Sequence, residues 1–329
     1  MSIQSKRTVL GLAAFVLGVV AISVVLVVPA AVAGPPPCQT KNVRTGVEYK
    51  GASPVTSAIT AAAAGDTINI YGTCYGNFTV SKDLTLRGQG KNATLDGNKQ
   101  GTVLHITNGT TTVDGLKITN GAADVSSPDN GGDCCVGGGI AVSGATAGAH
   151  LVKSLVTGNS ATLFGGGIDV DDGTLDLVNS TVSANTAVAG SGGIDTDFGT
   201  ITATGSTIGG NTVTNGSAGG IWNFGGTVTL NNSKVSGNSA SNPSPTLARG
   251  GGIRNQSALD STGTVVVSQA TLTLSGTTTI TGNQAEQGGG LSNRPLSTVL
   301  ASNWTGSISG NTPDQCNPTI TIGSTTCGS

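Results

Sequence analysis

The sequence repeats itself with a period of about 27 residues, and this repeat limits the folds that the chain can adopt. Gly-Gly-Ile or Gly-Gly-Leu recurs six times, and the first three intervals are 28, 26 and 27 residues. A second marker, Gly-Asn or Ala-Asn, recurs between these motifs. Repeats of this length are typical of solenoids, in which each repeat stacks on its neighbours. The two markers end at Ile140, Ile168, Ile194, Ile221, Ile253 and Leu291, and at Asn159, Asn185, Asn211, Asn238, Asn283 and Asn311, respectively.

Within each repeat, apolar and polar residues alternate as they do in β-strands. In the segment at residues 167–171, Ile168 and Val170 point to one side and two acids to the other. The segments at residues 174–177 and 180–183 alternate in the same way. Three short strands per repeat predict a three-sided coil, and stacked coils place equivalent residues in columns about 4.8 Å apart.

The composition supports this fold class. The 329 residues include 53 Gly but only 3% aromatic residues, too few to fill the core of a conventional globular domain. A solenoid needs only a thin stack of small aliphatic side chains and uses Gly at its turns. We therefore expect an all-β fold, a single right-handed parallel β-helix with three strands per coil. Residues 54–64 should form a short N-terminal capping helix, residues 258–268 should loop out of one coil, and residues 312–329 should close the C-terminal end.

The N-terminus carries the features of a signal peptide. Lys6 and Arg7 precede an uncharged apolar run at residues 9–28, and Ala-Val-Ala at residues 31–33 provides a signal-peptidase site. We expect residues 1–33 to be removed and residues 34–329 to form the β-helix domain. The alternative is an uncleaved run that anchors the protein in a membrane. In both cases the rest of the chain would be extracellular or at the cell surface, and the net charge of −2 favours no nucleic acid as a partner.

All six cysteines follow the expected cleavage site, an even number that suits an oxidising compartment. We expect Cys38 to pair with Cys74, which would join the N-terminal segment to the first coil. Cys316 with Cys327 would close the C-terminal segment. A bridge between the adjacent residues 134 and 135 would be strained, and the spacing of the cysteines fits no metal site.

Aligning the Gly-Gly-Ile strands places four carboxylates on two adjacent coils, and we call these four residues the acidic patch. Asp169 and Asp195 directly follow the Ile, and Asp171 and Asp197 lie two residues further on, all pointing away from the core. Like charges on neighbouring strands repel each other. Three arrangements would offset this repulsion: a Ca²⁺ ion bound by the four acids, a proton shared as in a general acid–base pair, or exposure to solvent.

The two columns that hold the acidic patch continue with residues suited to sugars. Trp222 and Phe224 offer aromatic faces on which sugar rings stack, and Arg254 and Arg294 suit uronate carboxylates. These four residues are therefore predicted to bind a ligand.

Two further columns complete the repeat. The inward position two residues after the Ile holds Asn223, Asn255 and Asn293, which predict a ladder of side-chain amides. On the next strand, outward pairs of Thr resemble an ice-binding surface, although Asp176 interrupts the array.

Several segments resemble known β-helix proteins. AAAAGDTI at residues 61–68, LTLRG at 84–88 and LKITNG at 116–121 resemble the opening of pectin-lyase-like right-handed β-helix proteins. SGNSA at residues 236–240, followed by GGGI at 250–253, is similar to repeats of polymorphic outer membrane proteins, which are adhesins. Those repeats typically carry a Phe where this chain has Val235 and Ile280. The resemblance implies the fold more than an activity.

The same resemblance argues against standard pectin-cleaving enzymes. Hydrolases of this fold typically carry Gly-His-Gly and Arg-Ile-Lys motifs, which this sequence lacks, and His105 and His150 are expected outside the acidic patch. Calcium-dependent pectate lyases place a basic residue beside several acids, whereas two coils, about 10 Å, should separate Arg254 from the nearest acid. We therefore expect a non-catalytic protein that binds a polysaccharide or cell-surface ligand. The alternative is a polysaccharide lyase or hydrolase that uses the acidic patch.

Overall fold

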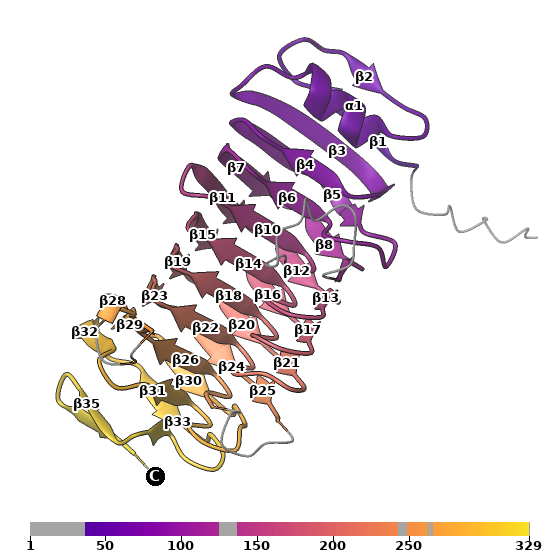
Figure 1. Ribbon diagram of the computed structural model, residues 1–329. Helices are drawn as coiled ribbons and strands as arrows, with labels where there is room; N and C mark the ends of the chain where they lie inside the picture. Colours follow the sequence, from indigo (N-terminus) through magenta and orange to yellow (C-terminus); the bar gives the residue numbers. More distant parts are fainter. Residues whose placement is uncertain (1–36, 125–136, 243–248, 262, 264–265, 329) are drawn as a thin grey trace, which may run out of the picture. The chain divides into compact units, whose positions relative to one another are not determined.

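The computed structural model describes residues 37–124, 137–242, 249–261, 263 and 266–328 (Figure 1). This part of the chain is nearly all β, with long parallel sheets, as expected for an all-β solenoid. It contains one α-helix, and that helix is too short to cross a membrane. The expected signal peptide and the cysteines at positions 134 and 135 lie outside the described residues.

The Gly-Gly-Ile segments form a nine-stranded parallel sheet, which we call sheet B. Its strands follow one another in chain order, so each repeat adds one strand (Figure 1). They are β4 (Phe78–Val80), β6 (Leu104–Ile106), β10 (Ile140–Ser143), β14 (Ile168–Asp171), β18 (Ile194–Asp197), β22 (Ile221–Phe224), β26 (Ile253–Gln256), β31 (Leu291–Asn293) and β34 (Cys316–Asn317).

The two strands that follow in each repeat belong to an 18-stranded sheet, sheet A, and a two-residue strand then joins sheet C. Sheet A contains β1 (Gln39–Asn42), β2 (Glu48–Tyr49), β3 (Asp66–Tyr75), β5 (Leu84–Asp96), β7 (Gly109–Asp114), β8 (Lys117–Thr119), β11 (Ala147–Val152), β12 (Leu155–Thr157), β15 (Thr174–Val178), β16 (Thr181–Ser183), β19 (Thr200–Thr204), β20 (Thr207–Gly209), β23 (Thr227–Asn231), β24 (Lys234–Ser236), β29 (Thr271–Gly276), β30 (Thr279–Thr281), β32 (Thr298–Trp304) and β33 (Ser307–Ser309). Sheet C contains β9 (Ala122–Ala123), β13 (Ser160–Ala161), β17 (Thr186–Ala187), β21 (Thr212–Val213) and β25 (Ser239–Ala240).

The core is a set of columns of small aliphatic side chains, one from each repeat. The strand registers place equivalent residues side by side in sheet A, and their side chains are fully buried. Because each layer is filled by Ile, Val, Leu and Ala, the chain needs few aromatic residues. One such column consists of Ile68, Leu86, Val113, Leu151, Leu177, Ala203, Leu230 and Leu274.

The glycines before each Ile are required by close backbone contact between coils. A Cβ atom at Gly166 would lie 2.3 Å from the carbonyl oxygen of Thr186, and one at Gly167 would lie 2.7 Å from that of Gly193. No side chain fits at these distances, which explains why Gly-Gly recurs with the period of the fold.

Three buried ladders of polar side chains run across the coils. The predicted ladder is confirmed: the Asn223 amide donates to Asn255, and Asn255 donates to Asn293, each at 2.8 Å. The Asn of the second marker forms a longer ladder, in which each amide donates to the next Asn side chain and also to a backbone carbonyl. A third ladder consists of Ser154, Ser180, Ser206, Ser233 and Thr278. The backbone N–H of each of the first four residues donates to the side-chain hydroxyl of the next residue in this series.

The N-terminal end is capped as predicted, although the helix is shorter. Helix α1 spans Pro54–Ala61, three residues less than expected, because the backbone of Ala62 is already extended. Strand β1 pairs with β3 in antiparallel orientation. Beside it, the Asp66 carboxylate accepts hydrogen bonds from Arg44 and Asn42, and the first of these partners holds its pKa well below the ordinary value.

Both predicted disulfides are confirmed. Cys38 bonds Cys74, and Cys316 bonds Cys327. The second bridge closes the hairpin of β35 (Ile320–Ile322) and β36 (Thr325–Cys327), whose Ile322 packs into the core. The predicted outward loop at residues 258–268 contains another antiparallel hairpin, β27 (Ala258–Leu259) with β28 (Val266–Ser268).

Candidate functional site

The structure brings the acidic patch together on β14 and β18. Asp169 lies directly beside Asp195 in the parallel register, and the same row continues to Trp222 and Arg254. Two coils therefore separate Asp195 from Arg254, as predicted. At the ends of β14 and β18, where Asp171 and Asp197 lie, the backbone N–H of Asp172 donates to the carbonyl of Asp197. This bond keeps the turns after the two strands side by side.

Two of the four acids are buried, and for them the alternative of a solvated surface is wrong. Asp169 is 3% exposed and Asp195 is 1% exposed. The turn at Gly190 covers the second carboxyl, because a Cβ atom at Gly190 would lie 2.7 Å from Asp195 Oδ2. Neither carboxylate oxygen of Asp195 forms a hydrogen bond, although the backbone N–H groups of Gly165 and Ser191 are oriented toward it.

Burial shifts the titration of these carboxyls. It raises the pKa of Asp169 and Asp195 well above the ordinary value, and the neighbouring acids raise both further. Burial, with the charges of Asp171 and Asp172, raises the pKa of Asp197 to about 6. Burial and the neighbouring charges therefore favour the neutral, protonated form of these two carboxyls, and that form reduces the repulsion inside the patch.

Within the described ranges, no group of three or more His, Cys, Asp or Glu side chains is arranged to hold a metal ion. Binding of Ca²⁺ by the four acids therefore stays a prediction.

Next to the acids lies a continuous row of four aromatic side chains, which we call the aromatic row. The ring centroids of Phe164 and Trp222 are 6.4 Å apart, those of Trp222 and Phe224 are 6.1 Å apart, and those of Phe224 and Phe198 are 5.8 Å apart. The chain has only five Phe and two Trp. Three of the five Phe thus lie in the aromatic row rather than in the core.

Phe198 is held in an unusual backbone conformation. Its φ is +60°, in the left-handed region that disfavours bulky residues. The equivalent turn positions in neighbouring coils are Gly144, Asp172 and Gly225, all with positive φ. The Phe198 side chain is nevertheless 45% exposed. Strain of this kind concentrates at functional sites.

A groove of about 460 Å³ is lined by three of the four residues of the aromatic row, and Phe198 lies outside its lining. Its lining includes Phe164, Trp222, Phe224, Arg254 and Gln256, so it contains three of the four residues predicted to bind a ligand. The Arg254 guanidinium lies 5.4 Å from the Trp222 ring centroid and donates to Ser217 Oγ at 2.6 Å. Burial lowers its pKa to about 10, with a further contribution from Arg249.

Two polar atoms in this groove lack partners. Trp222 Nε1, a donor, and Gln256 Oε1, an acceptor, are both buried without a hydrogen bond. Both atoms have almost no exposed surface.

Arg294 and His105 lie apart from this groove. Arg294 borders a different hollow of about 230 Å³ with Leu259 and Leu296. His105, which was expected outside the patch, lies in the row of Asp169, separated from it by Ala141. Its Nε2 lies 3.1 Å from the Ser143 hydroxyl. His150 is on sheet A, where it pairs with Asp176 at 2.7 Å.

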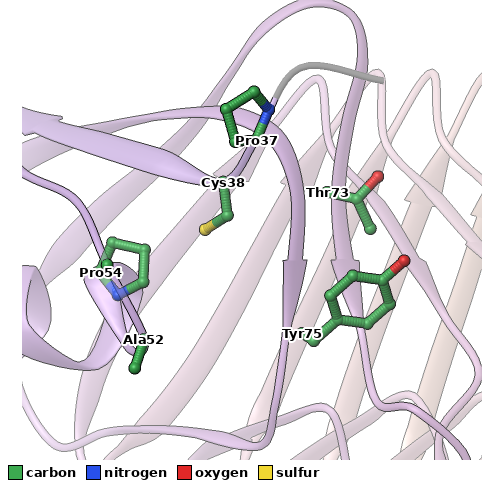
Figure 2. A pocket seen from close by; sticks show the side chains of 7 residues that line it. Pro37, Cys38, Ala52, Pro54, Thr73 and Tyr75 are labelled. Carbon is green, nitrogen blue, oxygen red and sulfur yellow. The ribbon is translucent and has the colours of Figure 1, made fainter. Parts of the chain in front are cut away.

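Another hollow lies at the N-terminal end, beside the Cys38–Cys74 bridge. Figure 2 shows Pro37, Cys38, Pro54, Thr73 and Tyr75 around this space of about 250 Å³. Its cysteine is in a disulfide, and its remaining lining offers only hydroxyl and backbone groups. The hollow therefore lacks the side chains of an acid–base or anion site.

The alignment of Gly-Gly-Ile columns thus placed Trp222, Phe224 and Arg254 near one another, as the structure does, but it did not include Phe164 and Phe198. Phe164 directly precedes the glycines of its repeat, and Phe198 directly follows an acid of the patch.

Comparison of the chain with known protein families, with curated proteins and with solved structures found no match.

Proposed function

We propose that this chain is an exported, non-catalytic protein that binds a polysaccharide along the groove of the aromatic row. Its fold would be a right-handed parallel β-helix with three principal strands per coil, exported through residues 1–33 to the extracellular space or the cell surface. The observation that carries the proposal is the aromatic row itself, in a chain with only 3% aromatic residues.

The geometry of the row suits a sugar chain. Aromatic faces bind the apolar faces of sugar rings, and Phe164, Trp222 and Phe224 all line the groove. Successive coils repeat at about 4.8 Å, so a polymer that runs across the strands would meet equivalent positions on each coil. The backbone strain at Phe198 keeps an aromatic ring at the end of this row.

Replacement of Trp222 by Ala should weaken polysaccharide binding by about tenfold or more, because the central ring of the row is lost. Affinity electrophoresis and calorimetry, with a panel of neutral and acidic polysaccharides with and without Ca²⁺, would measure this. Tyr75→Ala, which removes a 64% exposed aromatic side chain outside the row, is the matched control. Equal binding by both variants would contradict the proposed site.

Replacement of Phe198 by Gly should separate stability from binding. We expect the free energy of unfolding to rise by about 1 kcal/mol, because Gly adopts positive φ without strain, while polysaccharide binding weakens. Asp172→Gly changes the equivalent turn of the preceding coil and should leave binding unchanged. Urea unfolding and the same binding assay test both expectations, and a destabilised Phe198→Gly protein with normal binding would refute them.

A second candidate function is cleavage of an acidic polysaccharide by the acidic patch. It is favoured by the pKa of Asp197, about 6, since a general acid must hold its proton near neutral pH. Asp197 is only partly buried, whereas Asp169 and Asp195 lie beneath the turns. Short oligosaccharide products that disappear in Asp197→Asn would support this function over simple binding.

A further inference from the structure

We propose that the C-terminal edge of sheet A, formed by β32 and β33, binds the same edge of a second copy of this chain. Residues 298–302 and Trp304 of β32 pair only with β29, with a bulge at Asn303, and β33 pairs only with β30, among the strands of the described chain. Their outer backbone groups therefore have no strand partner there. The hairpin of β35 and β36 covers the core below them but pairs only with itself.

The opposite end of the sheet shows how this chain protects an edge. There, β3 is covered by the antiparallel strand β1, and β1 is followed by β2. Charged residues accompany these strands, namely Lys41, Arg44, Glu48 and Lys50. Charges and covering segments are the usual means of preventing edge-to-edge association.

The C-terminal edge lacks this protection by charge. The sequence has no charged residue between Arg294 and Asp314, a stretch that includes both edge strands. Leu296 is 53% exposed and Leu300 is 48% exposed. An uncharged edge strand with exposed aliphatic side chains favours pairing with another strand.

A second copy fits this edge better than a charged partner does. Two uncharged, identical edges approach without like-charge repulsion, and no charge is left buried without a counter-ion. If they pair in antiparallel orientation about a two-fold axis, each copy covers the edge of the other. The contact is then closed, and neither copy keeps an open C-terminal edge.

The test is the association state of a protein that begins at Gly34. This form retains every described residue, both disulfides and the complete core. Sedimentation between about 1 and 100 μM should show a reversible dimer, since dimer populations depend on protomer concentration. Leu300→Lys should weaken association by at least about tenfold, because it places like charges on both sides of the axis.

Thr229→Lys is the matched control. Thr229 lies in the same outward row as Leu300, but its strand β23 is paired on both sides. It should associate like the parent. In variants with one Cys introduced at a position from 299 to 303, the two copies of that Cys should form a disulfide-linked dimer only where the position lies near the two-fold axis. Monomers at every concentration, or equal effects of the two Lys variants, would overturn the proposal.

Discussion

Replacing Asn211 with Leu should lower the free energy of unfolding by about 4 kcal/mol, one of the largest effects of any single change in this chain. Asn211 is fully buried and makes four hydrogen bonds. It donates to Val182 O and Asn238 Oδ1 and accepts from the backbone and the side chain of Asn185. Leu fills a similar volume, but the backbone N–H of Asn185 loses its acceptor and Val182 O loses a donor, at about 1–3 kcal/mol each. Asn238 Oδ1 and the Asn185 amide each lose one of two hydrogen bonds.

Urea unfolding monitored by circular dichroism would measure this loss. Asn108→Leu changes an exposed Asn and should shift the midpoint little. An equally small shift for Asn211→Leu would mean that the ladder does not stabilise the coils.

Replacing Asp195 with Asn should stabilise the protein by about 2 kcal/mol at pH 8, because a buried carboxyl whose ionised form is disfavoured in the fold is replaced by a side chain that does not ionise. The pKa of Asp195 is raised in the folded protein, chiefly by burial. Such a carboxyl stabilises the fold fully below its unfolded pKa, about 3.9, and this stability is lost as the pH rises through the folded pKa. The advantage of the variant should therefore shrink toward pH 4.5.

Chemical unfolding at pH 4.5 and pH 8 tests this sign. More acidic solutions are avoided, because Asp66 has a lowered pKa and its stabilisation is lost only as the pH falls below about 4. Asp172→Asn removes an exposed carboxyl nearby and should change the pH dependence much less. A destabilised Asp195→Asn protein at pH 8 would show that the ionised carboxyl has a counter-ion in solution.

The repeat made most of the fold predictable, because three signals agree at each coil. Period, alternation and turn glycines fix which side chains face inward, and the registers of β14, β18, β22 and β26 match the alignment of the Gly-Gly-Ile motifs. The end of helix α1 was less predictable, since Ala62 and Ala63 suit a helix as well as an extended segment. The long Asn ladder was seen only as a marker, because a recurring Asn does not reveal whether its side chain turns inward.

For the candidate site, the sequence predicted which residues lie in the same row of sheet B but not which turns cover that row. Alignment of columns gives neighbours from one strand to the next, so it placed Asp169, Asp195 and Trp222 in one row. It does not show how the turns fold back over a row, which is why the burial of Asp169 and Asp195 was not foreseen. Phe164 joins the aromatic row from such a turn, and its position depends on the path of the chain rather than on the period.

The way in which the long Asn ladder ends has a consequence for variation in coil number. Gln315 Oε1 accepts from the backbone N–H and the side-chain amide of Asn311, the same two bonds that each Asn oxygen accepts inside the ladder. Each Asn inside the ladder thus makes the same bonds as its neighbours, and Gln315 supplies the acceptor for the last Asn of the ladder. A duplication or deletion of one whole repeat between Asn185 and Asn238 would leave every amide satisfied, whereas the loss of Gln315 would not. The ladder therefore sets no fixed number of coils, whereas its C-terminal end depends on Gln315.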